Sequence, residues 1–439
     1  MSLDRPGLSA LGYAQQSITP TLDREVYLAG FGQNRLAQGV HDDLYVRALA
    51  LNLGDTCLVL AALDLVGLSR LHCLEIEQRV VERSQGQVSP RLILACTHTH
   101  HGPDTIGLWG PDASTSGVDP RYLVTLKRRV VDTVMEALAR LQPTGLRTTS
   151  VHVPGVAKNA RDPQVVDDEL TCLQFCRPGD GAASLPSSLD GAASLPSSLD
   201  GAASLPFSLG GGGVLATVLL FPCHPEVLWE HNPQMSSDYP HFLRRAVEAE
   251  TGAPCLFFAG ALGGMMTPDV RDHSFEEAEA MGGVLARAAL DALQEVEATP
   301  VDRLECVSRE FAVPMENPVF HAAMRGGLLP HLLTEEGMVV TQANLLKVGS
   351  AWLVSVPGEL LPKLGLAIKA DLRRAGARVA GVIGLANDEL GYILPREDYV
   401  YPEDPFDPGD HYEETMSIGP QMGPRLLATV RSMIQTTED

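Results

Sequence analysis

The amino-acid sequence predicts a layered α/β fold built on a mixed sheet. Strand-like apolar runs alternate with amphipathic helical segments along most of the chain. No linker rich in Pro, Gly or Ser divides residues 1–180 or residues 214–439. Because 439 residues, of which 45% are hydrophobic, are enough to bury a large core, we expect residues 1–439 to form a single domain.

In the first half of the chain, short apolar runs predict strands at residues 91–96, 169–175 and 214–221. Residues 120–141 are expected to form a helix, because their apolar side chains recur at helical spacing. The apolar face of this helix consists of Leu123, Leu126, Val130, Val134, Leu138 and Leu141. A strand followed by such a helix is typical of a sheet covered by helices.

The second half of the chain continues the same alternation. Helices are expected at residues 238–250, 275–296 and 361–375. Strands are expected at residues 254–258, 304–313, 342–348, 352–356 and 378–385. Gly349 and Ser350 are expected to form a two-residue hairpin turn between the third and fourth of these strands.

A low-complexity segment interrupts the chain between two expected strands. Residues 181–210 contain a ten-residue unit three times, GAASLPSSLD, GAASLPSSLD and GAASLPFSLG, and three glycines follow. This composition cannot bury enough apolar area to order itself, so residues 181–213 are expected to be a flexible insertion in a surface loop. The unit is shorter than a solenoid repeat and lacks an apolar stripe.

Charge and composition exclude several classes of function. The chain has 33 Lys and Arg against 55 Asp and Glu, which gives a formal charge of −22 and disfavours binding to nucleic acid or anionic membranes. No apolar run reaches the roughly 18–20 residues of a membrane span. Residues 1–6, MSLDRP, carry an early acid with no apolar run after them, so we expect no secretory signal, and a mature secreted form is the alternative. The eight cysteines form no CxxC pair and mostly lie in apolar runs, so we expect reduced thiols and a cytoplasmic protein.

A histidine-rich segment directly follows the strand 91–96. Residues 97–103 read THTHHGP, and alternate side chains of an extended chain share a face, which brings His98 and His100 together. Two imidazoles on one face suit a zinc site, and the alternative is a polar strand end whose histidines bond to the backbone. Gly102 and Pro103 exclude the metallo-β-lactamase pattern HxHxDH.

Three other strand ends carry side chains that suit a metal or catalytic site. His224 lies between two prolines after the strand 214–221, Glu359 precedes a helix, and Tyr392 lies in a loop. Each also has a simpler interpretation. His224 is then an ordinary turn histidine, Glu359 a carboxylate that complements a helix dipole, and Tyr392 a packing tyrosine.

Four motifs occur in the order found in the catalytic domain of neutral/alkaline ceramidases, which the chain resembles from about residue 15 to about residue 430. They are THTHHGP at 97–103, CHP at 223–225, PGE at 357–359 and NDELGYILP at 387–395. Flanking segments at 17–20, 29–32, 39–48, 160–163, 237–240 and 411–415 also look like family segments.

The resemblance implies one zinc ion per chain, held by His98, His224, Glu359 and Tyr392. These nitrogen and oxygen donors suit zinc and leave a position for water. Zinc lowers the pKa of its water to about 7, so a zinc-bound hydroxide is expected to attack an acyl carbonyl.

The resemblance also implies roles for three further residues. His100 is expected to stabilise the oxyanion or to protonate the leaving amine. Arg161 and Tyr412 are expected to line the site and contact substrate or intermediate. The alternative for Arg161 is an ion pair with an acid such as Asp162 or Asp167.

Two departures from the family pattern bear on substrate and architecture. Ala261 and Gly264 stand in the turn 259–268, where the family carries polar groups, so we expect either a lost hydrogen-bond donor or a wider pocket. The larger ceramidases end in an immunoglobulin-like sandwich, which we do not expect here, because only about 25 residues follow the Tyr412 segment.

These expectations predict a zinc-dependent hydrolase of linear amide bonds, acting on a ceramide-like or other fatty-acyl amide as a small-molecule substrate. The alternatives are a zinc esterase or lactonase, an acyltransferase that forms amides, in either case tailoring a specialised metabolite, and a catalytically inactive lipid-binding relative.

Overall fold

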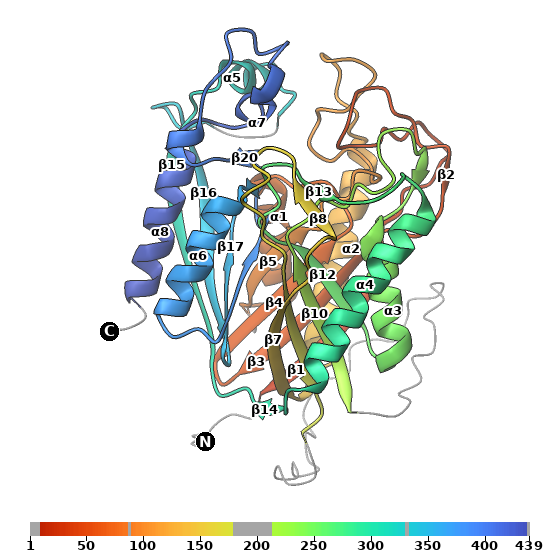
Figure 1. The fold of residues 1–439 in the computed structure, drawn as a ribbon, viewed down its shortest axis with the longest axis vertical. Helices are drawn as coiled ribbons and strands as arrows, with labels where there is room; N and C mark the ends of the chain where they lie inside the picture. Colours follow the sequence, from red (N-terminus) through yellow and green to blue (C-terminus); the bar gives the residue numbers. More distant parts are fainter. Residues whose placement is uncertain (1–8, 87–88, 179–212, 330–332, 437–439) are drawn as a thin grey trace.

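Three large sheets and the helices that cover them make up the fold (Figure 1). The structure is a computed structural model and describes residues 9–86, 89–178, 213–329 and 333–436. The repeat predicted to be a flexible insertion lies, apart from Gly213, outside these residues.

The first sheet carries the loop with the histidine motif. Its strands, in order across the sheet, are β5 (Arg91–Cys96), β4 (Thr56–Leu63), β3 (Tyr45–Leu53), β1 (Ala10–Ser17) and β6 (Gln142–Pro143). β4 and β5 are parallel and the other pairs are antiparallel, so the sheet is mixed, as predicted. The helix α2 (Pro120–Ala139) packs on β1 and β3, and α1 (Arg70–Arg83) packs beside α2.

The second sheet carries the other candidate histidine. Its strands are β12 (Cys255–Ala259), β10 (Val214–Phe221), β9 (Glu169–Cys176), β7 (Gly145–His152) and β14 (Thr299–Pro300). The helix α4 (Phe275–Gln294) packs on β7 and β9, and α3 (Tyr239–Thr251) packs on β12 and α4. Since β9 and β10 are antiparallel neighbours, the repeat joins adjacent strands, as predicted.

The third sheet leads to the candidate acid and tyrosine. Its strands are β15 (Leu304–Pro314), β16 (Met338–Val348), β17 (Ala351–Ser355) and β19 (Val379–Ile383), covered by α6 (Pro362–Arg374) and α8 (Met422–Thr436). Just beyond it, β18 (Glu359–Leu360) pairs in parallel with β20 (Tyr392–Ile393), which places Glu359 opposite Tyr392.

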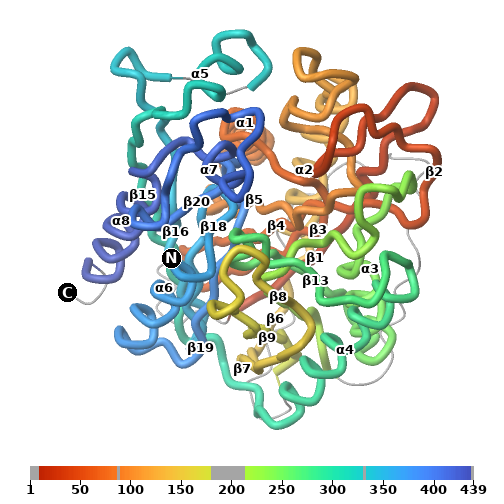
Figure 2. The backbone as a smooth tube through the Cα atoms, turned by 45° about the horizontal axis from the view of Figure 1, so that its top comes forward, coloured from red at the N-terminus to blue at the C-terminus, as the bar shows by residue number. Residues whose placement is uncertain are grey.

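Four short strand segments form two further pairs in the loops at the site end. β2 (Gly39–Val40) pairs with β11 (Gln234–Met235), and β8 (Ala157–Asn159) pairs with β13 (Met266–Pro268). The short helices α5 (Pro318–Arg325) and α7 (Tyr412–Thr415) lie at the same end of the molecule in both views (Figures 1 and 2). The loops at this end therefore surround the strand ends that carry the motifs.

A central core joins the three sheets. Leu49 of the first sheet, Phe175 of the second and Leu353 of the third belong to one buried cluster. The predicted layered α/β architecture is confirmed, and the described residues contain no immunoglobulin-like sandwich.

Two further observations concern the cysteines and the helices of the described residues. The eight cysteines form no disulfide in the described residues, and six of them are buried. In the part of the chain that the structure describes, no helix is long and apolar enough to cross a membrane.

Candidate metal centre

The histidine loop leaves the end of β5 in a strained conformation. His98 has a φ of 68°, in the left-handed region that non-glycine residues rarely adopt. Its backbone N–H donates to Leu65 O, and its ring Nδ1 lies 2.6 Å from Val66 O. This carbonyl fixes the proton on Nδ1, so Nε2 is left as a free ligand atom.

His224 is held in the same way from the second sheet. Its backbone N–H donates to Met266 O at 2.8 Å, and its Nδ1 lies 2.9 Å from the same carbonyl oxygen. Nε2 is again the ring nitrogen that remains as a possible metal ligand. Backbone carbonyls behind two imidazoles are the arrangement that orients histidine ligands in metal sites.

Glu359 lies between the Nε2 atoms of His98 and His224. Its Oε2 is 3.1 Å from His224 Nε2 and 3.4 Å from His98 Nε2. Burial raises the pKa of this carboxyl, but the facing imidazoles lower it to about 2. Burial lowers the pKa of His224, and the charges of Glu226 and Glu359 raise it to about 9. Two nitrogens and one carboxylate oxygen thus converge from three segments of the chain.

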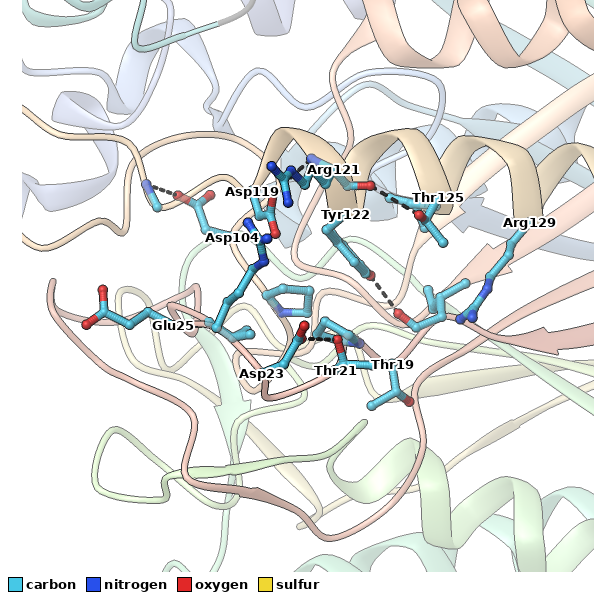
Figure 3. Close-up of a pocket in the computed structure, with 17 residues that line it drawn as sticks. Thr19, Thr21, Asp23, Glu25, Asp104, Asp119, Arg121, Tyr122, Thr125 and Arg129 are labelled. Carbon is cyan, nitrogen blue, oxygen red and sulfur yellow. Dashed lines mark hydrogen bonds between the residues drawn. The ribbon is translucent and has the colours of Figure 1, made fainter.

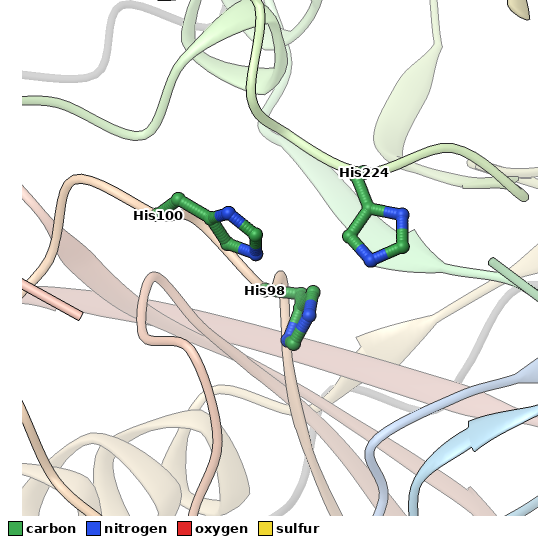
Figure 4. Close-up of side chains that lie close together, drawn as sticks. All are labelled: His98, His100 and His224. Carbon is green, nitrogen blue, oxygen red and sulfur yellow. The ribbon is translucent and has the colours of Figure 1, made fainter. Parts of the chain in front are cut away.

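His100 completes a buried cluster with His98 and His224. One nitrogen from each ring lies within 4.8 Å of the others, and the three rings converge in Figure 4. His100, predicted as a catalytic residue, is therefore also placed to bind a metal. Burial, followed by the neighbouring imidazoles, lowers the pKa of His100 well below its usual value. Imidazole nitrogens beside a carboxylate are a donor set that fits zinc.

A cavity of about 50 Å³ opens over these residues. Its polar lining includes His98, His100, Glu359, Tyr392, Tyr412 and Glu389. Its apolar lining includes Val66, Ile106, Leu108, Trp109, Phe320, Met324, Leu329, Leu390, Met416 and Ile418. The structure thus brings six of the seven predicted site residues to one place, since His224 contacts the Glu359 side chain directly.

The two tyrosines are close to each other in this cavity. The ring centroids of Tyr392 and Tyr412 are 6.1 Å apart, and the Tyr392 hydroxyl donates to Met265 Sδ at 3.3 Å. Burial raises the pKa of Tyr392 well above its usual value. Thioether sulfur is a weak acceptor, so a stronger partner can displace it.

Arg161 does not line the cavity but braces the helix α7. Its Nη2 donates to Glu414 Oε1 at 2.8 Å, and its Nη1 also pairs with Glu413. In the described residues it pairs with neither Asp162 nor Asp167, the acids named as alternatives, and Asp167 binds Lys369 instead. Arg161 therefore holds the helix that carries Tyr412.

Of the two departures in the turn 259–268, neither Ala261 nor Gly264 is among the described residues that line the cavity. A Cβ added at Gly365 of α6 would lie 2.4 Å from the Ala261 Cβ, and Gly264 has a φ of 73°. The small Ala261 side chain therefore allows α6 to pack closely, and Gly264 allows a left-handed turn.

A larger cavity, of about 330 Å³, lies between residues 18–26 and the start of α2 (Figure 3). It contains none of the predicted site residues. The Tyr122 hydroxyl crosses it to donate to Ile18 O at 2.8 Å. This cavity shares no lining residue with the histidine cluster.

Sequence reasoning missed two buried acids beside the cluster. Glu226 follows His224 by two residues and has a charge that raises the His224 pKa, and Glu389 lines the cavity. The two prolines around His224 were a usable signal for Glu226, because the rigid backbone of Pro225 also fixes the residue that follows it.

No protein-family model matches this chain, and no curated protein matches it. Solved structures do match the chain. A neutral ceramidase from Pseudomonas aeruginosa is 17% identical with a TM-score of 0.73, and the match covers 98% of this chain and 75% of that chain. A structure described as ceramidase complexed with C2 has the same identity and coverage and a TM-score of 0.74. The resemblance found in the four motifs is thus confirmed in three dimensions, and the chain has the neutral ceramidase fold.

Proposed function

We propose that this protein is a zinc-dependent amidohydrolase that cleaves the amide bond of an N-acylated small molecule. One observation carries the proposal: the Nε2 atoms of His98 and His224 converge on Glu359 Oε2 beside a cavity with a largely apolar wall. The similarity to ceramidase structures supports the reaction class.

Each residue of the centre has a part in this function. His98, His224 and Glu359 would hold the zinc ion, and Tyr392, which lines the same cavity and pairs with Glu359 in the strand register, would be the fourth ligand. When bound, zinc supplies a Lewis acid and lowers the pKa of a water molecule to about 7.

His100 and Tyr412 supply protons and hydrogen bonds at the reacting carbonyl. Both line the cavity beside the cluster. Departure of an amine requires its protonation, and a neutral imidazole that collects a proton from the attacking water can deliver it. The Tyr412 hydroxyl is a donor for the negative charge that develops on the carbonyl oxygen.

The apolar side chains over the centre suit the acyl part of the substrate. A volume of about 50 Å³ is far below the roughly 300–1,000 Å³ of common ligand pockets. Phe320 and Met324 of α5 form part of the wall, so a long acyl chain requires these side chains to move outward. Water excluded by this wall strengthens the polar interactions below it.

The proposal is tested by metal analysis and by product analysis together. The purified protein is expected to contain one zinc ion per chain, and His98→Ala and His224→Ala are expected to lose it. The matched control is His231→Ala, an exposed histidine whose side chain is 89% accessible. Mass spectrometry of a panel of N-acyl sphingoid bases, N-acyl amino acids and lipopeptides identifies the substrate.

Ester counterparts of the same panel separate amide from ester hydrolysis. Faster cleavage of the ester would favour the esterase alternative. A wild-type protein without zinc, or His98→Ala and His224→Ala variants that keep both zinc and activity, would contradict the proposal.

A further inference from the structure

Glu226 is a buried carboxylate that has no evident structural reason to be there. It is 1% exposed, and neither of its oxygens makes a hydrogen bond in the described residues. Burial raises the pKa of Glu226, and the charge of His224 and the nearby Thr267 side chain oppose this rise only in part. Leaving a buried carboxylate without a hydrogen-bonded partner costs free energy, so its presence indicates a task.

One candidate partner is His100. Glu226 Oε2 lies 3.3 Å from His100 Nδ1, and this nitrogen is also buried without a hydrogen bond in the described residues. The backbones are adjacent, because the His100 N–H donates to Pro225 O at 3.4 Å. Hydrogen bonds at catalytic sites are often long before substrate binds and tighten afterwards.

Packing prevents the His100 ring from turning away from Glu226. The Phe31 ring meets it edge-on with centroids 4.8 Å apart, and Arg35 Nη1 donates to the His100 carbonyl. A Cβ at Gly30 would lie 2.2 Å from His100 Cγ, so only glycine leaves room for the ring. With Nδ1 facing Glu226, the opposite nitrogen Nε2 is the atom available to the cavity.

The three histidines of the cluster differ in the group that lies behind Nδ1 of each ring. In His98 and His224 a backbone carbonyl lies behind Nδ1, at 2.6 Å and 2.9 Å. In His100 the Glu226 carboxylate occupies that place. A carboxylate behind an imidazole fixes its tautomer and, unlike a carbonyl, also stabilises the imidazolium form.

We propose that Glu226 is a positioning residue, which accepts the Nδ1 proton of His100 and thereby presents its Nε2 to the cavity. The proposal deepens the proposed function and rests on it only for its catalytic consequence. The tautomer itself is a property of the protein whether or not an amide is cleaved. It is also the same whether His100 binds the metal or transfers a proton.

Nitrogen NMR of histidine tests the tautomer without any substrate. Protein with ¹⁵N-labelled histidine is measured metal-free and zinc-loaded, and His100→Gln identifies the His100 signals. The wild type is expected to carry the His100 proton on Nδ1, Glu226→Gln to keep it there through its amide oxygen, and Glu226→Met to lose the preference. A proton on Nε2 in the wild type, or no change in Glu226→Met, would overturn the proposal.

Kinetics test the consequence, with a short-chain ceramide and the N-acyl amino acids of the panel as probes. Glu226→Met is expected to lower kcat about 10–100-fold with KM nearly unchanged, and Glu226→Gln to recover most of the loss. In a His100→Gln background, Glu226→Met is expected to have no further effect. Fully additive losses would contradict a role exercised through His100.

Thermal unfolding separates positioning from a structural role. Removal of an unpaired buried carboxylate is expected to leave the Tm of Glu226→Met equal to or above that of the wild type. The matched control is Glu169→Gln, a buried acid that binds Lys369 and Arg373, which is expected to lower Tm and leave kcat unchanged. If the wild type cleaves no probe, the proposed function fails and the NMR result still decides the tautomer.

Discussion

Two buried groups of charged side chains in this molecule differ in how they are satisfied. Asp64 and Arg244 form a two-fold contact of 2.7 Å and 2.9 Å, and Ser237 adds a third bond at 2.7 Å. In the histidine cluster, both Glu226 oxygens and His100 Nδ1 make no hydrogen bond in the described residues. In the first group both oxygens of the buried carboxylate are paired, although Arg244 Nε has no hydrogen bond in the described residues. In the second group neither oxygen of the Glu226 carboxylate has one.

This difference separates a structural ion pair from a candidate reaction site. Buried polar groups in folded proteins are almost always hydrogen-bonded, so exceptions that gather in one place indicate a ligand or a catalytic task. The strained φ of His98 belongs to the same region. Substitutions in the two groups are therefore expected to affect different measurements.

The largest effect on stability is expected in the structural pair. Arg244→Met leaves the buried Asp64 carboxylate without its counter-charge, and we expect a loss of about 3–5 kcal/mol in the free energy of unfolding. Urea denaturation measures this loss. Zinc bound per folded chain is expected to stay unchanged, and loss of zinc from the folded fraction would contradict the separation of the two groups.

The largest effect on metal binding is expected from Glu359→Gln. The substitution removes the only carboxylate that contacts both His98 and His224 among the described residues. We expect zinc affinity to fall at least about 100-fold, because even residues behind the ligands contribute 10–100-fold. The measurement is the rise in Tm on adding zinc, which should disappear in this variant and persist in Arg244→Met.

A smaller effect is expected from Arg161→Met. The substitution removes the ion pairs that hold Glu413 and Glu414 of α7 and so loosens the position of Tyr412. We expect kcat to fall about 10-fold while zinc content stays at one per chain, since misplacement of a catalytic group lowers rate without removing the metal. A loss of zinc in parallel with activity would instead assign Arg161 to the metal centre.

The smallest expected effect is a change in the pH dependence of stability. Burial raises the pKa of Glu169, but the hydrogen bond from Arg373 and the charge of Lys369 bring it down to about 2, from 4.5 in the unfolded chain. The unfolded chain therefore binds more protons, and the contribution of Glu169 is full above pH 4.5 and disappears as the pH falls towards 2. Urea denaturation across this range should show a flatter pH slope for Glu169→Gln than for the wild type.

Much of the fold was predictable because the buried strands and amphipathic helices have clear apolar patterns. The expected helix 275–296 is α4 at Phe275–Gln294, and the expected strand 342–348 lies within β16. The strand β3 and the helix α1 were not predicted. β3 is apolar on both faces and shows no alternation, and the apolar face of α1 is narrow, with three buried residues.

The candidate site was predictable where its residues follow strand ends. His98, His224 and Glu359 meet because the strands before them end at one edge of the packed sheets. The partners of Arg161 were not predictable, because Glu413 and Glu414 are more than 250 residues away in sequence and nothing local indicates the contact. Glu226 was missed because its significance depends on the distance to His100, which only the folded chain defines.

The most direct test of the central claim is X-ray diffraction at the zinc absorption edge from crystals of the zinc-loaded protein. We expect one anomalous peak per chain, in contact with His98 Nε2, His224 Nε2 and Glu359. Crystals with no peak at this position, or with zinc bound only elsewhere on the chain, would contradict it.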